Sequence, residues 1–157
     1  MSKPSSPPGY ELPLRLLLAF RVLIDGLHEE LGRQGHPEVR PLHGFVLQAI
    51  GPGGTSAAEL GRCLGVSKQA AGKTVDVLER MDYLERVADH RDARRKQVRL
   101  TAHGTDCLVR SAQIFDELRT GWEATLGEQR LRELEHDLRR MTPPELMRLD
   151  APGWFGG

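Results

Sequence analysis

Hydrophobic residues recur at helical spacing over several stretches of the chain, and breaks between the stretches separate the elements. The first stretch predicts a helix over residues 11–32. Its apolar surface is wider than one stripe, because further hydrophobic residues flank the main face: Leu12, Leu14, Leu18 and Val22. A helix that is apolar on several faces must be covered on several faces. In a small protein this cover often comes from a second subunit, which predicts a dimer.

The remaining pattern predicts a helix–turn–helix followed by a β-hairpin and two more helices. Helices are expected over 42–50, 57–64, 68–81, 101–126 and 128–141, and alternating strands over 83–87 and 97–100. Ser56 and Glu59 form a capping-box pattern, and Ser67 is placed to cap the next helix. This order is that of a winged helix–turn–helix, a mainly α fold with a small two-stranded β wing.

The chain divides into five segments by this pattern. We expect a disordered Pro/Ser-rich leader (1–9), an N-terminal dimerisation helix with its connection (10–41) and a winged-helix domain (42–101). C-terminal dimerisation helices (102–141) and a tail (142–157) carrying Trp154 and Phe155 follow.

Formal net charge is zero, but charge is unevenly distributed along the chain. The segment from Arg62 to His103 contains ten Lys and Arg and six Asp and Glu. The segment from Asp116 to Glu145 contains five Lys and Arg and eight Asp and Glu. A basic middle and an acidic end create a directed field, and such a field orients a polyanion.

Several function classes find no support in the sequence. Cys63 and Cys107 have no metal-ligand spacing, and no cofactor, metal or catalytic motif is visible. The first apolar stretch contains Arg15, Arg21 and Asp25, which argues against a membrane span, so we expect a cytoplasmic protein that is not an enzyme. We expect both cysteines to be buried and structural, with Cys63 on the inward face of its helix.

The helix over 68–81 presents two different faces. Ala71, Val75 and Leu78 recur at i, i+4 and i+7 and predict a buried seam. The opposite face starts with residues whose chemistry suits DNA: Ser67, Lys68, Gln69, Gly72, Lys73 and Thr74. Glutamine can pair with adenine, lysine with guanine or phosphate, and serine with a phosphate oxygen. The alternative is a solvated helix face that happens to be basic.

The hairpin loop places four cations within six residues: Arg91, Arg94, Arg95 and Lys96. Such a loop repels itself unless its charges are paired, and Asp89 and Asp92 can hold one arginine while the others meet phosphates or a narrow minor groove. The alternative is a solubilising loop.

Taken together, these motifs resemble the MarR family of winged-helix transcriptional regulators over about Leu12 to Met141. The resemblance rests on residues 65–69, 77–81 and 83–86, on Asp89-x-Arg91-Asp92, and on residues 98–104. His90 stands where the family often has proline, and Asp82 where a helix-ending glycine is common; aspartate tolerates that left-handed conformation.

The resemblance implies a homodimer on a pseudo-palindromic operator in double-stranded DNA, usually a repressor that releases DNA on meeting a small-molecule effector. It also implies major-groove reading by Ser67, Lys68, Gln69 and Lys73, and a wing arginine oriented by Asp89. His28 and His43 could line an effector pocket, although ordinary packing or a capped helix end explains them better. Alternatives are a winged-helix protein-interaction module and a redox-responsive regulator using Cys63 or Cys107.

Overall fold

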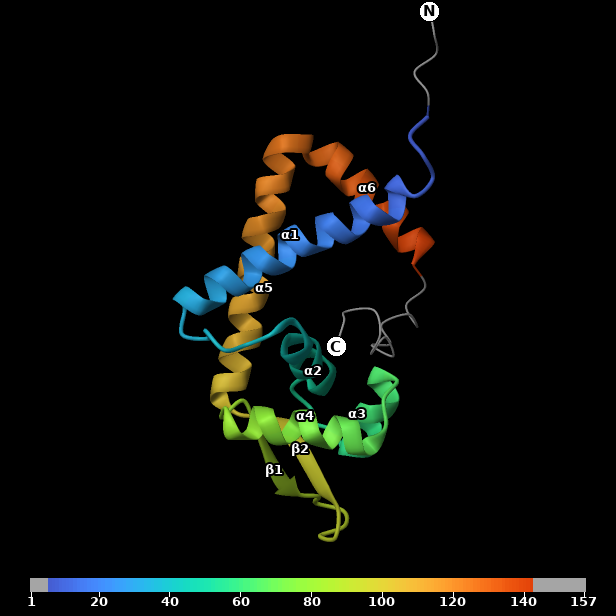
Figure 1. Ribbon diagram of the computed structural model, residues 1–157. Coiled ribbons are helices and arrows are strands. Elements are labelled where there is room, and N and C mark those ends of the chain that lie inside the picture. Colours follow the sequence, from blue (N-terminus) through green and yellow to red (C-terminus); the bar gives the residue numbers. More distant parts are fainter. Residues whose placement is uncertain (1–5, 143–157) are drawn as a thin grey trace, which may run out of the picture.

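The computed structural model describes residues 6–142 and confirms the predicted fold class (Figure 1). Within these residues it contains α1 (Glu11–Arg33), α2 (Pro41–Ile50), α3 (Ala57–Leu64), α4 (Lys68–Arg80), β1 (Leu84–Ala88), β2 (Lys96–Leu100), α5 (Ala102–Leu126) and α6 (Glu128–Met141). Each predicted element is present, with its bounds shifted by no more than one residue. Trp154 and Phe155 lie outside the described residues.

The elements separate into a head and a helical framework. Helices α2, α3 and α4 and the β1–β2 hairpin gather at one end of the molecule, which we call the head. Helix α5 runs from this head to α6 at the other end, and α1 crosses α5 between them, as Figure 1 shows. None of the helices in the described part is long and apolar enough to cross a membrane.

A single hydrophobic core joins the head to the framework. Its members come from every helix but α6 and from both strands: Leu27, Leu31, Val46, Leu47, Ile50, Leu60, Leu64, Ala71, Val75, Leu78, Leu84, Val98, Cys107 and Ile114. Because α1 and α5 contribute to the same core as α4, the head cannot rotate freely on the framework.

Helix α3 corrects one of our predictions. Cys63 is exposed, whereas the inward face of α3 is formed by Leu60, Gly61 and Leu64. Gly61 is required there, because a Cβ at this position would lie 2.9 Å from the Val66 carbonyl oxygen. This close approach rotates the helix so that Cys63 lies to one side of the buried face. Cys107 is buried as predicted, and burial raises the pKa of its thiol.

The head and α5 meet at the short junction between α4 and β1. Asp82 has a positive φ of 64°, a left-handed conformation that aspartate tolerates better than most residues do. Tyr83 N–H then donates to the Leu78 carbonyl at 2.9 Å, and Thr101 N–H donates to the Tyr83 carbonyl at 3.1 Å. A Cβ on Gly104 would lie 2.2 Å from that carbonyl oxygen, so only glycine lets α5 begin against this junction.

Gly104→Ala is expected to lower the free energy of unfolding by about 1–3 kcal/mol, because the added methyl collides with backbone that cannot rotate away. Gly121→Ala, on the same helix with nothing within 4 Å of its Cβ, is the matched control. It should raise stability by about 0.5–1 kcal/mol through helix propensity. Urea unfolding at one fixed protein concentration measures both, and equal effects would contradict the assigned packing at Gly104.

Candidate nucleic-acid interface

The turn between α3 and α4 fixes where α4 begins. Gly65 ends α3 in the left-handed conformation with φ 69°, and the Val66 amide donates to the Gly61 carbonyl at 2.9 Å. Ser67 then caps α4, its Oγ accepting from the Ala70 amide at 3.0 Å. The Ser67 hydroxyl keeps a proton to donate, so this capping residue can also hydrogen-bond a ligand oxygen.

Helix α4 buries one side and exposes the other. Ala71, Val75 and Leu78 are each no more than 1% exposed, which confirms the predicted seam. Lys68, Gln69 and Lys73 are exposed on the opposite side. Gly72 is half-buried with open space around its Cβ position, and Thr74 Oγ1 donates to the Ala70 carbonyl at 3.4 Å. The structure thus brings the predicted α4 residues together within the first two turns.

Strands β1 and β2 form the wing in antiparallel register, with Leu84 opposite Leu100 and Ala88 opposite Lys96. Glu85 and Arg99 face each other across the strands, and their Oε1 and Nε atoms are 2.6 Å apart. Thr55 adds a bridge to Val98, which ties the wing to the segment before α3. The wing therefore has a fixed position in the head.

The wing loop is folded by its own aspartates. Asp89 Oδ1 accepts from the Arg91 amide at 2.9 Å, and Asp92 Oδ1 accepts from the Arg94 amide at 3.0 Å. The Asp89 amide also donates to the Arg95 carbonyl at 2.9 Å, which closes the loop. Both carboxylates thus act on backbone amides, as in Asx turns, and Asp89 contacts Arg91 through its amide.

The cationic ends of the loop point to solvent. Arg95 Nε lies 3.9 Å from Asp92 Oδ2 with its side chain 79% exposed, which is a weak pair in water. Arg91, Arg94 and Lys96 are also exposed, and none of them has an ion pair within residues 6–142. The loop presents four cations whose charges are largely uncompensated.

Arg86 braces the wing against α4, a role that the sequence pattern did not reveal. Its Nη2 is 2.6 Å from Asp76 Oδ1, and its Nη1 donates to Glu79 Oε2. Burial opposes the charge of Arg86, but the hydrogen bonds to the two carboxylates outweigh burial and raise its pKa. The visible signal was an acidic pair one helical turn apart on α4, followed by an arginine in the next strand.

The α4 face and the wing loop lie at the end of the molecule remote from α6 (Figure 1). One element offers hydrogen-bonding side chains on an exposed helix, and the other offers cations on a narrow loop. A helix of this kind fits a major groove, and a cationic hairpin fits the phosphates or the minor groove beside it. The arrangement can therefore bind a duplex polyanion through two adjacent features.

The two histidines predicted for an effector pocket lie in the α1–α2 region. His28 Nδ1 hydrogen-bonds the Ile24 carbonyl at 2.8 Å, while its buried Nε2 has no hydrogen-bond partner. His43 Nδ1 accepts from the Arg40 amide at 3.2 Å. Burial lowers the pKa of His43, and the charges of Arg40 and His28 add to this effect. Nearby, the rings of Phe20 and Phe45 stack with centroids 6.4 Å apart.

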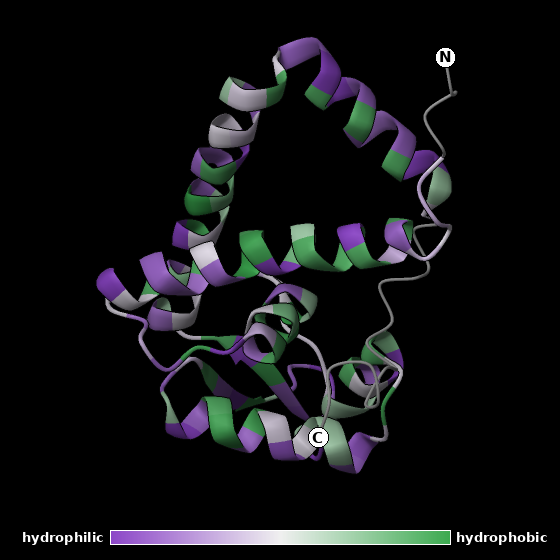
Figure 2. Cartoon of the chain, turned by 45° about the horizontal axis from the view of Figure 1, so that its top comes forward, coloured by the Kyte–Doolittle hydropathy of each residue, from purple (hydrophilic) through white to green (hydrophobic). Residues whose placement is uncertain are grey.

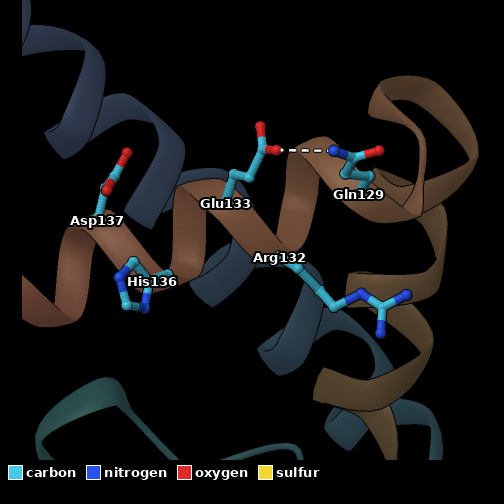
Figure 3. A pocket seen from close by; sticks show the side chains of 5 residues that line it. All are labelled: Gln129, Arg132, Glu133, His136 and Asp137. Atoms are coloured by element: carbon cyan, nitrogen blue, oxygen red, sulfur yellow. Dashed lines mark hydrogen bonds between the residues drawn. The ribbon is translucent and has the colours of Figure 1, made fainter.

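A separate hollow of about 550 Å³ lies along α6 and contains none of the predicted site residues. Figure 3 shows Gln129, Glu133 and Asp137 on one side of the helix, and Arg132 and His136 on the other. All five come from one helix and the hollow is open to solvent. Among residues 6–142, no three His, Cys, Asp or Glu side chains gather closely enough to hold a metal ion.

Comparison with solved structures shows a shared fold. MarR from E. coli, in its apo form, has a TM-score of 0.65 at 21% identity, covering 88% of this chain and 100% of that one. YusO from Bacillus subtilis has a TM-score of 0.64 at 20% identity, and the match covers 84% of this chain and 92% of YusO. A MepR mutant from S. aureus, bound to an oligodeoxyribonucleotide, has a TM-score of 0.60 at 20% identity. The match covers 85% of this chain and 96% of that one.

The sequence comparison points to the same group. No curated protein matches the chain significantly. The family model described as the MarR family matches residues 39–95, which span α2 to the wing loop. Residues 39–95 are therefore similar to the MarR family, and the described chain shares its fold with the solved MarR, YusO and MepR structures.

Proposed function

We propose that this protein is a sequence-specific DNA-binding transcriptional repressor that acts as a homodimer on a pseudo-palindromic operator. The observation that carries the proposal is the pairing of an exposed, hydrogen-bonding α4 face with a cationic wing loop, held together by the Arg86 brace. The MepR structure with a bound oligodeoxyribonucleotide supports it, because that protein shares the fold.

In this proposal α4 reads the major groove. Gln69 pairs with a base, Lys68 and Lys73 contact guanine or phosphate, and Ser67 donates to a phosphate oxygen. Gly72 leaves room for close approach to the DNA. Arg91, Arg94, Arg95 and Lys96 contact phosphates or enter the minor groove, and Asp89 holds the loop that carries them.

Homodimer formation is supported by the apolar surface of the framework. Large hydrophobic residues are exposed along α1 and α6: Leu12, Leu14, Leu16, Leu17, Leu18, Val22, Leu134, Leu138 and Met141. Figure 2 shows hydrophobic stretches on both helices. So much exposed apolar surface is typical of an interface, and a second copy would cover it. Residues 10–41 and 102–141 then serve dimerisation, and residues 42–101 serve DNA binding.

Release by a small-molecule effector completes the proposal, with His28 and His43 facing the ligand. The buried Nε2 of His28 has an unsatisfied lone pair that a ligand donor could fill. MepR bound to ethidium bromide is a further structure with this fold. An effector would act by shifting the population between two separations of the heads.

Replacing Arg94 and Arg95 together by alanine should weaken operator binding and lower the slope of log affinity against log salt by about one to two per subunit. The probe is a duplex selected from a random library by repeated binding and amplification. Arg130→Ala with Arg132→Ala, which removes the same charge from α6, is the matched control and should leave the slope unchanged. An unchanged slope in the wing variant would rule out the wing contact, and failure to select any duplex would favour a protein-interaction module.

Arg86→Gln is expected to weaken operator binding about tenfold, because the wing loses its fixed angle to α4 while Asp76 and Glu79 lose their shared partner. Arg99→Gln breaks the exposed pair with Glu85 inside the wing and serves as the control, with stability changed by about 0.5 kcal/mol or less. Fluorescence anisotropy measures the operator affinity, and urea unfolding measures the stability. Normal DNA affinity in Arg86→Gln would contradict the brace.

Leu18→Glu combined with Val22→Glu should convert the protein from a dimer to a monomer, since both side chains are exposed on α1 and would be buried charges at the interface. Sedimentation equilibrium should give twice the chain mass of 17.5 kDa for the unmodified protein and once for the variant. Leu42→Glu, an exposed apolar position on α2, is the control. A wild-type monomer would refute the proposed assembly.

A further inference from the structure

A chain of polar side chains connects the framework to the junction that starts the wing. At the end of α1, Gln34 Oε1 accepts from Arg110 Nη1 at 3.1 Å, and Arg110 Nε donates to Asp106 Oδ2 at 2.7 Å. The same Asp106 oxygen is 2.9 Å from His36 Nε2, and His36 Nδ1 is 2.8 Å from the Tyr83 hydroxyl. Gln34 and His36 follow α1, and Asp106 and Arg110 belong to α5. Tyr83 lies between α4 and β1.

His36 is the central member of this chain. It is 1% exposed, and it is the one buried polar or charged residue of the described part of the protein. Its ring stacks on His103 with centroids 4.5 Å apart, and His103 also lies 4.4 Å from the Tyr83 ring. The His36 amide donates to the Leu31 carbonyl at 2.9 Å, so the residue is anchored to α1.

The hydrogen bonds of His36 fit its neutral form. Burial raises the pKa of Tyr83 to about 12, so its hydroxyl remains a donor at physiological pH, and no other hydrogen bond of that hydroxyl occurs within residues 6–142. His36 Nδ1 therefore accepts from Tyr83, which leaves Nε2–H to donate to Asp106. Hydrogen bonds from Arg110 and His36 hold the pKa of Asp106 below its usual range, so its carboxylate is available as the acceptor.

A protonated His36 does not fit the same arrangement. Its Nδ1–H would point at the Tyr83 hydroxyl, which would lose the acceptor for its own proton. The other charged groups beside the ring are Asp106 and its partner Arg110, and the His103 ring stacks on His36. Glu38, Asp106 and Cys107 are the other groups that act electrostatically on Tyr83, and a neutral Cys107 thiol adds no counter-charge. Protonation of His36 would thus keep the pair with Asp106 but remove the acceptor of the Tyr83 hydroxyl proton.

We propose that neutral His36 is the positioning residue that holds the head on the framework in its DNA-binding arrangement, and that acidification releases this hold and lowers operator affinity. The inference rests on the proposed DNA-binding function and adds a regulatory input to it. Histidine suits this role because its charge changes between about pH 5 and 8. Tyr83 connects His36 to the head, because its amide donates to the Leu78 carbonyl near the end of α4 and the residue directly precedes β1.

The test compares operator affinity at about pH 7.5 and pH 5.5 at constant ionic strength, with the full chain and the duplex selected as above. The unmodified protein should lose about tenfold in affinity on acidification. His36→Gln keeps a donor for Asp106 and an acceptor for Tyr83 but cannot be protonated, so it should bind normally at the higher pH and lose less than about threefold at the lower pH. His136→Gln, exposed on α6, is the control and should behave as the unmodified protein.

A scrambled duplex separates this effect from general electrostatics, because protonation of His90 in the exposed wing loop acts on any DNA. Equal acid loss in His36→Gln and the unmodified protein, or no loss in the latter, would overturn the inference. If circular dichroism shows that His36→Gln does not fold, Tyr83→Phe replaces this variant. If Tyr83→Phe still loses as much operator affinity on acidification as the unmodified protein, the inference is also overturned. Absence of specific binding at both pH values would refute the proposed function itself.

Discussion

Helix α4 can show only one face to solvent, and the geometry of the candidate interface depends on this constraint. Ala71, Val75 and Leu78 are fully packed against the core, so rotation of α4 about its axis would expose them and bury Lys68 or Lys73. The seam therefore determines which side chains a duplex meets. It also sets where Asp76 and Glu79 point, and through Arg86 it sets the angle of the wing.

The periodic and capping patterns were enough to predict most of this arrangement. The spacing of Ala71, Val75 and Leu78 separates the two faces of α4, and Ser67 marks its start, because both signals are local along the chain. The cationic loop was visible for the same reason. Whether these residues contact DNA stays a prediction.

Contacts between distant segments were beyond the reach of the pattern. Arg86 lies ten residues from Asp76, and His36 lies 47 residues from Tyr83 and 70 from Asp106, so helical and strand periodicity do not pair them. The error at Cys63 has a different origin. Helical spacing predicted Cys63 on the inward face, but the close approach of the Val66 carbonyl places Gly61 there.

The wing loop is folded by hydrogen bonds of its own, and this affects how binding would be driven. Asp89 and Asp92 accept from the Arg91 and Arg94 amides, so the loop backbone is held by contacts that need no partner. Only the outer bonds of the arginine side chains then lose rotational freedom on contact, and the entropic penalty of association is smaller than for a loop that must fold against its target. The aspartates thus reduce the net positive charge of the loop but give it a defined shape, which favours discrimination between surfaces over indiscriminate attraction.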